Sequence, residues 1–190
     1  MKLIPLTQGK FAKVSDCDYK FLMQWPNRWL YMKVKKGGYA GCRMWDGSKY
    51  RTVFMHMIVA KRKGLKNFQE VDHKNHDKLD CQRRNLRAAT SSQNKGNIPL
   101  SPCNRSGYKG VSRSGERWWQ VHICPDGDGK PKSLGQFPKT RKGKIQAAYT
   151  YTVAADKVFG KFANYEPVAH LLDSKIKRQI KKDVLQRLSA

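Results

Sequence analysis

The chain has 190 residues, of which 39 are Lys or Arg and 14 are Asp or Glu, so its formal net charge at pH 7 is +25. So large an excess of positive charge indicates a polyanionic partner such as a nucleic acid. Hydrophobic residues make up 39% of the chain and aromatic residues 11%, which is enough to fill compact cores and argues against a wholly disordered protein. No apolar run approaches the roughly 20 residues of a membrane-spanning helix, and the first ten residues lack the apolar centre of a signal peptide. We therefore expect an intracellular protein that is neither secreted nor bound to a membrane.

An alternation of apolar and polar residues with a period of two runs through residues 28–56 and predicts half-buried antiparallel strands. Gly37-Gly38 and Asp46-Gly47 fall between the runs as hairpin turn signals. One face of this meander is apolar, and the other carries aromatic rings and basic side chains suited to a nucleic-acid groove. The residues predicted to contact DNA here are Lys33, Lys35, Arg43 and Arg51. The alternative is an ordinary solvated charged surface.

The central segment, residues 71–97, reads VDHKNHDKLDCQRRNLRAATSSQNKGN. A strand entered at residue 68 is predicted to end at Asp72-His73, and a polar loop leads to a second strand over residues 86–89. A capping box at residues 90–93 then opens a helix. This order of strand, loop, strand and helix brings Asp72, His73 and Asn94 near one another, with Asn85 in or beside the loop.

These side chains suit the hydrolysis of a phosphodiester bond. A hard cation such as Mg²⁺ takes oxygen ligands and keeps positions open for phosphate and water, which suits the carboxylate of Asp72 and the amide oxygen of Asn94. A neutral imidazole such as that of His73 can deprotonate the attacking water near pH 7. The central segment is therefore predicted to be a metal-dependent nuclease site.

The spacing of three residues carries a family resemblance, because Asn85 lies twelve residues after His73 and Asn94 nine residues after Asn85. In this register the segment resembles the HNH, or His-Me finger, motif of homing endonucleases encoded by phages and group I introns. The resemblance implies that His73 is the general base and that Asp72 and Asn94 bind one divalent metal ion, Mg²⁺ with Mn²⁺ as a substitute. It also implies that Asn85 hydrogen-bonds to the loop backbone and holds His73 in place. Arg87, on the second strand, is assigned to DNA contact.

Two further residues of the loop raise the alternative of a zinc site. His76 and Cys81 depart from the family pattern and lie within nine positions of His73. A zinc ion bound there would consume the proposed base and would lack a fourth ligand at ordinary spacing, so we do not expect zinc. The five cysteines are far apart with no C-x-x-C pair, which also argues against a disulfide framework. His56, before an apolar run, is interpreted as a packing or helix-start histidine, with a phosphate contact as the alternative.

The composition changes after Asn94, where Asn, Pro, Ser and Gly predominate without periodicity, and residues 99–106 are predicted to be a linker. Three strands are predicted beyond it, over residues 108–111, 117–123 and 132–137. A helix over residues 140–159 has an apolar stripe that would cover one face of this sheet.

This second region resembles the Apetala or ethylene-response-factor type of DNA-binding domain. The strings that carry the resemblance are Tyr-Lys-Gly-Val at 108–111, Leu-Gly-Gln-Phe at 134–137, Ala-Ala-Tyr at 147–149 and Ala-Ala-Asp at 154–156. The resemblance implies that the sheet lies in the major groove of DNA. The residues it assigns to base or phosphate contacts are Lys109, Arg113, Arg117, Trp118, Gln120, His122, Ser133 and Gln136.

The last segment, residues 166–190, repeats apolar residues at helical spacing opposite a face rich in Lys and Arg. Three roles are open for this amphipathic helix. It packs on the second domain, clamps the DNA backbone, or forms a dimer contact.

Together these features predict an α+β protein. A ββα-metal nuclease domain (residues 1–98) begins with a β-ribbon extension (1–66) and contains the metal motif (67–98). A DNA-binding domain (107–190) follows, with a three-stranded antiparallel sheet on one helix and the C-terminal amphipathic helix. The predicted function is hydrolysis of double-stranded DNA at a specific site, by a monomer or a dimer, as a nickase or a double-strand cutter. The rival interpretation is a DNA-binding regulator without nuclease activity.

Overall fold

The computed structural model describes residues 1–35, 37–126 and 129–189. The chain forms two compact units, Met1–Thr90 and Ser91–Ala190, and each is described here by itself. The division by contacts therefore falls between Thr90 and Ser91. The predicted limits of the domains and linker, at residues 98 and 107, stay a prediction.

The first unit begins with a β-hairpin. It lies within the predicted β-ribbon extension, but its strands were not predicted individually. Strands β1 (Lys2–Pro5) and β2 (Phe11–Val14) pair antiparallel across a short 3-10 turn, η1 (Thr7–Gly9). Helix α1 (Asp16–Met23) follows. Ile4, Ala12 and Val14 are fully buried, so the inward residues of this hairpin contribute to the core of the unit.

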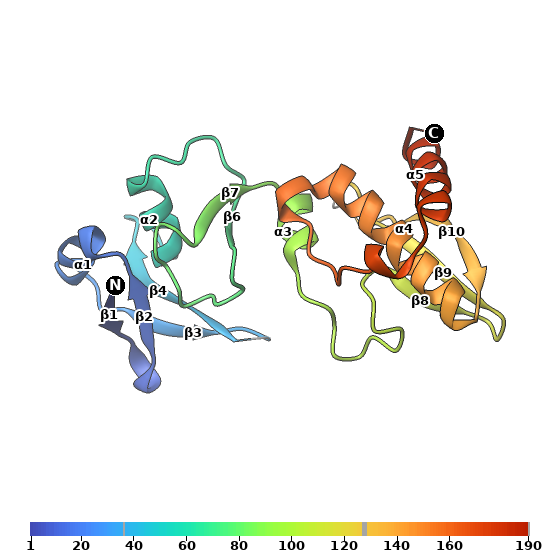
Figure 1. Cartoon of the computed structure of the whole chain (residues 1–190). Coiled ribbons are helices and arrows are strands. Elements are labelled where there is room, and N and C mark those ends of the chain that lie inside the picture. The colour runs from blue at the N-terminus through green and yellow to red at the C-terminus, as the bar shows by residue number, and fades with distance from the viewer. Residues whose placement is uncertain (36, 127–128, 190) are drawn as a thin grey trace. The chain divides into compact units, whose positions relative to one another are not determined.

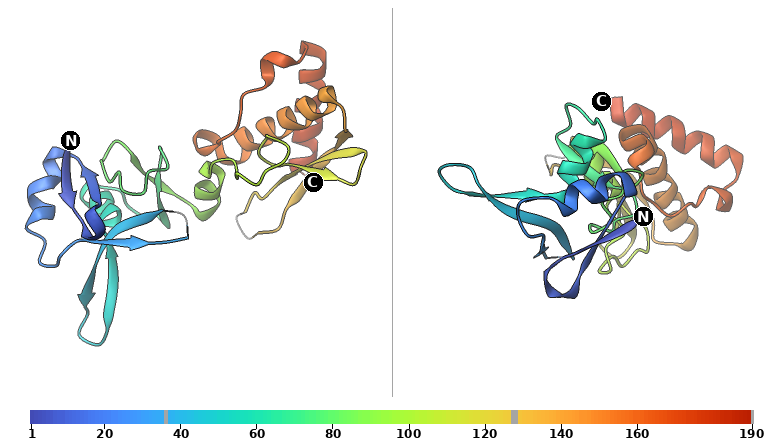
Figure 2. Two further views of the ribbon diagram at one scale, coloured as in Figure 1. Left: turned by 90° about the horizontal axis from the view of Figure 1, so that it is seen from below. Right: turned by 90° about the vertical axis from the view of Figure 1, so that its left-hand side faces the viewer.

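The predicted meander is confirmed as a three-stranded antiparallel sheet in the order β3-β4-β5. Its strands are β3 (Leu30–Lys33), β4 (Gly38–Trp45) and β5 (Tyr50–Phe54), and helix α2 (Met55–Arg62) follows directly. Ala40 and Cys42 are buried on the inner face. Figure 1 labels β3 and β4 of this sheet, and Figure 2 shows that the outer half of the β4–β5 hairpin extends away from the rest of its unit.

A two-stranded antiparallel sheet closes the first unit. Strands β6 (Glu70–His73) and β7 (Leu86–Ala89) pair so that Asp72 faces Arg87 and His73 faces Leu86. The connecting loop is tied to α1 through the fully buried carboxylate of Asp18, which accepts hydrogen bonds from Nε and Nη2 of Arg83, each at 2.7 Å. The next element in the chain is α3 (Ser91–Asn97), so the predicted order of strand, loop, strand and helix is confirmed. Helix α3 belongs to the second unit, and its packing on the β6–β7 hairpin stays a prediction.

The second unit contains an antiparallel sheet in the order β10-β9-β8, covered on one face by helix α4. The elements are β8 (Val111–Ser114), β9 (Trp118–Ile123), β10 (Lys132–Pro138) and α4 (Arg141–Phe159). Thr140 caps α4, since its side chain accepts a hydrogen bond from the backbone N–H of Gly143 at 3.0 Å. The arrangement of three strands and one covering helix was predicted correctly. Its likeness to the Apetala type of domain stays a prediction.

The first strand of this sheet was predicted three residues too early, at residues 108–111. Gly107 and Gly110 both have φ in the left-handed region, at +79° and +71°, which turns the chain before Val111. The Oγ of Ser106 stabilises this turn by donating to the carbonyl of Val111 at 2.8 Å. The segment predicted to be a linker is therefore an ordered loop at its C-terminal end.

The C-terminal segment forms the 3-10 turn η3 (Ala169–Leu171) and helix α5 (Ser174–Ser189), after a further 3-10 turn, η2 (Gly160–Phe162). Ile180 and Val184 of α5 are buried where it packs against α4, which confirms the first of its three predicted roles. Ala190, the end of the predicted helical segment, lies outside the described residues. Among the helices that the structure describes, none has the length and hydropathy needed to cross a bilayer.

Candidate functional site

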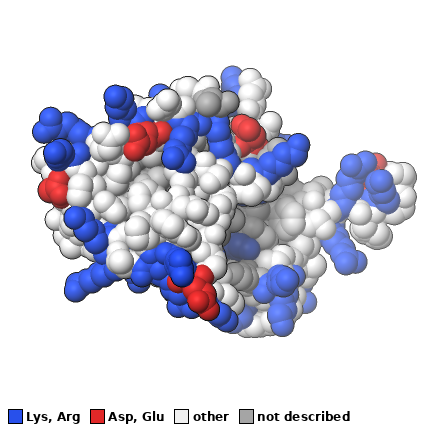
Figure 3. Space-filling view, turned by 90° about the vertical axis from the view of Figure 1, so that its right-hand side faces the viewer, with Lys and Arg blue, Asp and Glu red and all other residues white. Residues whose placement is uncertain are grey.

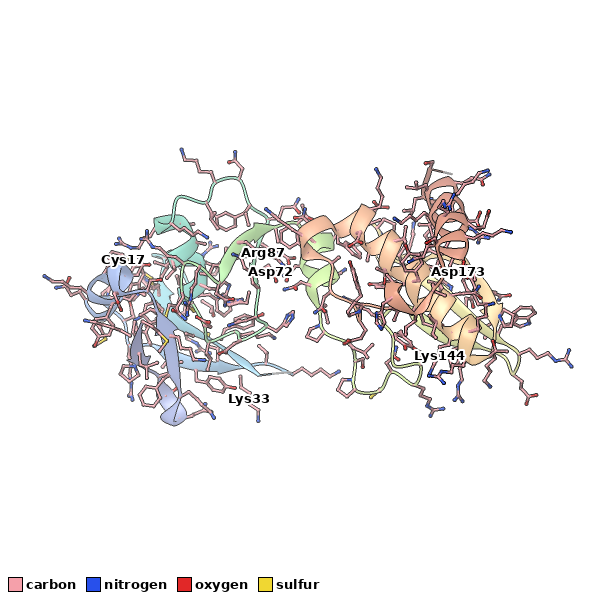
Figure 4. The ribbon with its side chains drawn as sticks, in the orientation of Figure 1. Cys17, Lys33, Asp72, Arg87, Lys144 and Asp173 are labelled. Carbon is pink, nitrogen blue, oxygen red and sulfur yellow. The ribbon has the colours of Figure 1, made fainter. Side chains whose placement is uncertain are left out.

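Asp72 and His73 are the last two residues of β6. The side chain of Asp72 is 3% exposed, and its Oδ2 accepts a hydrogen bond from Nε of Arg87 at 2.7 Å. Figure 4 shows these two side chains next to each other. The guanidinium thereby orients the carboxylate, because the two residues are direct partners across the strands. The structure engages Arg87 with Asp72, and the contact with DNA assigned to Arg87 stays a prediction.

His73 is buried and neutral. Burial lowers the pKa of its imidazole to about 4, although the carboxylates of Asp72, Asp77 and Asp80 act in the opposite direction. A neutral imidazole has a lone pair with which to accept a proton, so His73 is in the protonation state that a general base requires near pH 7.

Asn85 connects the two ends of the β6–β7 loop. Its Oδ1 accepts a hydrogen bond from the backbone N–H of Asn75 at 3.1 Å, and its Nδ2 donates to the carbonyl of Asp80 at 2.7 Å. The backbone N–H of Lys74, the residue after His73, donates to the carbonyl of Asn85 at 3.0 Å. These bonds hold the loop backbone directly beside His73.

His56, at the start of α2, packs against His73 within an aromatic cluster. The two imidazole rings are 5.0 Å apart between centroids at an angle of 66°, and Phe54 and Tyr39 contact the His56 ring at 5.5 Å and 5.3 Å. His56 is 8% exposed, and its Nδ1 has no hydrogen-bond partner among the described residues. Burial, and then the neighbouring His73, lowers the pKa of His56 to about 3. The structure thus favours packing over phosphate contact for His56. It also adds Tyr39 to the residues around His73, whereas the sequence pattern marks Tyr39 only as an aromatic residue of a strand.

Asn94 lies on α3 in the second unit. The structure therefore groups Asp72, His73 and Asn85 within the first unit. The approach of Asn94 to these three residues stays a prediction, as do the roles assigned to all four.

The donor chemistry of the predicted ligands fits a hard divalent cation. Asp72 and Asn94 both offer side-chain oxygen atoms, and an ion with two protein ligands keeps positions for water and phosphate. Within residues 1–35, 37–126 and 129–189, no three or more His, Cys, Asp or Glu side chains are grouped to hold a metal ion. Cys81 is fully buried, and burial raises the pKa of its thiol, so the thiol stays protonated. The expectation that no zinc binds at His73, His76 and Cys81 stays a prediction.

The basic residues predicted to contact DNA from the meander are exposed. Lys33, Lys35 and Arg43 extend from the surface of the first unit. Arg51 is also exposed, and its Nε donates to the carboxylate of Asp46 within the β4–β5 hairpin.

In the second unit, one sheet face collects most of the predicted contacts. Strand pairing places Trp118, Gln120, His122, Ser133 and Gln136 on the face opposite α4. Arg117, just before β9, is exposed. Lys and Arg side chains surround a largely uncharged area on the face of this unit that Figure 3 shows. The contacts of these residues with DNA stay predictions.

Two basic residues of this set are placed differently from the expectation. Arg113 pairs with the buried Trp119, so it lies on the sheet side that faces α4. The family resemblance assigned Arg113 to DNA contact, and that contact stays a prediction. Lys109 donates from Nζ to the carbonyls of Gly96 and Ile98, at 2.5 Å and 2.6 Å, and burial lowers its pKa to about 8. Lys109 therefore caps the end of α3.

Comparison with known proteins covers the segment that contains the candidate site residues. A protein-family model described as HNH endonuclease matches residues 53–95, a range that contains His56, Asp72, His73, Asn85 and Asn94. An uncharacterized HNH endonuclease of Acanthamoeba polyphaga mimivirus is 33% identical to the chain over 158 residues, which is 82% of this chain and 74% of that relative. The chain belongs to the HNH endonuclease family. HNH endonucleases are hydrolases that generally use a divalent metal ion. No solved structure matches the chain.

Proposed function

We propose that this HNH endonuclease hydrolyses phosphodiester bonds of double-stranded DNA at specific sites, as homing endonucleases of phages and group I introns do. The observation that carries the proposal is the placement of Asp72, His73 and Asn85 around one edge of the β6–β7 hairpin, in a segment that matches the family. The net charge of +25 supports DNA as the substrate, because phosphate contacts dominate the affinity of such complexes.

His73 acts as the general base in this mechanism. Its neutral imidazole takes a proton from the water that attacks phosphorus, and the resulting cation lies beside the carboxylate of Asp72. Asn85 holds the loop backbone at Asn75 and at Asp80, so the ring of His73 keeps its position during attack. Arg87 orients the Asp72 carboxylate.

Asp72 and Asn94 are the residues proposed to hold one divalent ion, Mg²⁺ or Mn²⁺. When bound, such an ion stabilises negative charge on the phosphate and on the departing 3′ oxygen. For Asn94 to serve, α3 must approach the end of β6, which is the arrangement of a ββα-metal motif. With the ion bound, the carboxylate of Asp72 would be shared between the ion and Arg87, whose Nε donates to Oδ2.

The sheet of the second unit is proposed to select the cleavage site. Its outward face carries Trp118, Gln120 and His122, whose ring, amide and imidazole groups can contact base edges. We further propose that the protein acts inside the cell as a monomer.

The proposal is tested by cleavage of a plasmid library that covers candidate target sequences. Supercoiled DNA is incubated with Mg²⁺, with Mn²⁺ or with EDTA, and the products are mapped with each strand labelled separately. The wild type should give discrete nicks or breaks with either metal and none with EDTA. The His73→Ala variant should bind DNA but cut at least about a hundredfold more slowly, in line with the usual contribution of a general base.

The matched control is His76→Asn, which alters an exposed histidine three residues away. Asn is chosen because His76 has φ +64°, a conformation that Asn tolerates better than Ala. This variant should cut at the wild-type rate. Intact supercoiled DNA with the wild type in both metals, together with tight binding, would support the rival function of a DNA-binding regulator without nuclease activity.

A further inference from the structure

Two exposed aromatic side chains face each other at the tip of the β4–β5 hairpin. Trp45 is 57% exposed and Tyr50 is 69% exposed. They are the last pair of the two strands, and their rings contact each other edge to face, with centroids 5.2 Å apart and planes at 63°. Contiguous apolar surface that stays exposed to water is a mark of interaction sites. The active site described above uses neither residue.

The turn that carries this pair is held rigidly by Asp46. Its Oδ1 accepts hydrogen bonds from the backbone N–H groups of Ser48 and Lys49, at 3.0 Å and 2.9 Å, and from the hydroxyl of Ser48 at 2.9 Å. Its other carboxylate oxygen accepts from Nε of Arg51. Gly47, at φ +99°, supplies the left-handed residue of the turn. Little conformational entropy is therefore lost when the two rings bind a partner.

Basic side chains accompany the rings on the hairpin. Arg43 lies two residues before Trp45 on β4, so it projects from the same face as Trp45 and Tyr50, and its side chain is exposed. Lys49 is exposed in the turn next to Tyr50. Figure 2 shows that the hairpin reaches out from its unit, which leaves its tip accessible to a large partner. Aromatic rings flanked by cations on a projecting ribbon match a base stack bordered by phosphates.

We propose that Trp45 and Tyr50 form a wedge that enters a groove of duplex DNA and partly unstacks one base step. Because the rings meet edge to face, one ring lies parallel to the exposed base while the other supports it from the side. Arg43 and Lys49 contact the phosphates that flank the step. This inference rests on the proposed function, since it takes DNA as the substrate.

The test uses the 190-residue chain and duplexes that carry one 2-aminopurine at successive positions around the cleavage site. The fluorescence of 2-aminopurine rises when its neighbours unstack. Wild-type protein should raise the fluorescence at one step at a fixed distance from the cut. The Trp45→Ala/Tyr50→Ala double variant should lose that rise and bind DNA roughly tenfold or more weakly, as expected for the loss of an aromatic stacking contact. Both changed residues are exposed, so the thermal unfolding of the variant should match the wild type.

The control is Phe11→Ala, which removes a 51% exposed ring from strand β2 of the same unit. It should keep both the fluorescence rise and the affinity. Unchanged affinity and fluorescence in the double variant would overturn the wedge. The wedge would also be overturned if the double variant binds more weakly but the wild type raises the 2-aminopurine fluorescence at no position.

The outcome is separable from that of the proposed function. If the wild type binds DNA without cutting it, the same measurements are made by anisotropy and fluorescence on a panel of duplexes with 2-aminopurine at different steps. A rise in 2-aminopurine fluorescence that depends on Trp45 and Tyr50 would then support the wedge, although the nuclease proposal would have failed. Cleavage by the wild type without any such rise would support the nuclease and overturn the wedge.

Discussion

Arg87 and Asp72 are direct partners across strands β6 and β7, and Nε of Arg87 donates a hydrogen bond to Oδ2 of Asp72 at 2.7 Å. Both side chains are largely buried, at 15% and 3% exposure. The carboxylate proposed as a metal ligand is thus oriented before any ion binds. Arg87, which the sequence marks only as a basic residue predicted to contact DNA, is thus also the partner that orients Asp72.

The Arg87→Ala variant should lower the free energy of unfolding by about 3 kcal/mol, because it removes the guanidinium from a buried carboxylate. Urea denaturation of the purified protein measures this change. Arg84→Ala is the matched control, since Arg84 is exposed three residues earlier, and it should change stability by less than about 0.5 kcal/mol. Equal losses in the two variants would show that the ion pair with Asp72 contributes nothing specific.

The Asn85→Ala variant should separate DNA binding from cleavage. It removes the hydrogen bonds to the N–H of Asn75 and the carbonyl of Asp80, which should cost about 2 to 3 kcal/mol of stability. The loosened loop should reduce the cleavage rate more than tenfold, while the dissociation constant for DNA stays within about twofold, since Asn85 is buried. Single-turnover cleavage and fluorescence anisotropy measure the two quantities. Gln69→Ala, at an exposed position before β6, should leave both unchanged, and a parallel loss of binding and cleavage in Asn85→Ala would contradict the positioning role.

Stability should fall as the pH is lowered from about 6.5, because of His56. The folded protein keeps this histidine neutral down to about pH 3, whereas the unfolded chain binds a proton at its ordinary pKa of 6.5. Protons therefore favour the unfolded state between these two values, and each pKa unit of difference corresponds to about 1.4 kcal/mol. His73, with its pKa lowered to about 4, acts in the same direction.

The His56→Phe variant should weaken this pH dependence. Phenylalanine keeps a ring against Phe54 and Tyr39 but cannot be protonated. Urea denaturation at pH 7.5, 6 and 5 should show a smaller loss of stability than in the wild type. Identical losses in the two proteins would mean that His56 is accessible to protons in the folded state.

Gly110 should tolerate no side chain. A Cβ at this position would lie 1.9 Å from the ring of Tyr151, and its φ of +71° is also unfavourable for other residues. Gly110→Ala should therefore destabilise the second unit by more than about 3 kcal/mol. Gly115 provides the comparison, because it has φ +59° but open space around its Cβ, so Gly115→Ala should cost only about 1 kcal/mol. Hydrogen exchange of amides in β9 and α4 measures both effects, and similar values for the two variants would contradict the clash with Tyr151.

Several elements could be predicted because their signals are local. Strand β7 has the predicted bounds, and α4 starts one residue after the predicted start, since Thr140 caps it. The strands of the β3-β4-β5 sheet follow from alternation and from the turn at Asp46-Gly47, which depend only on neighbouring residues. The chemistry of Asp72, His73 and Asn85 could also be recognised from residue type and spacing alone. Strand β8 was misplaced because Gly107 and Gly110 turn the chain through a conformation that period-two patterns do not reveal.

The partners of individual side chains depended on contacts between distant segments. Nothing near Arg87 in the sequence shows that it binds Asp72 fifteen residues earlier, because that pairing is set by the register of two strands. His56 meets His73 only after α2 has packed on the β6–β7 sheet, and Asp18 meets Arg83 only after α1 has reached the loop. Residue type and local periodicity therefore determined which groups are available for chemistry and which segments form strands or helices. The folded core, which brings segments together at the cost of chain entropy, determined which charges are paired, which histidines are neutral and which rings stay exposed.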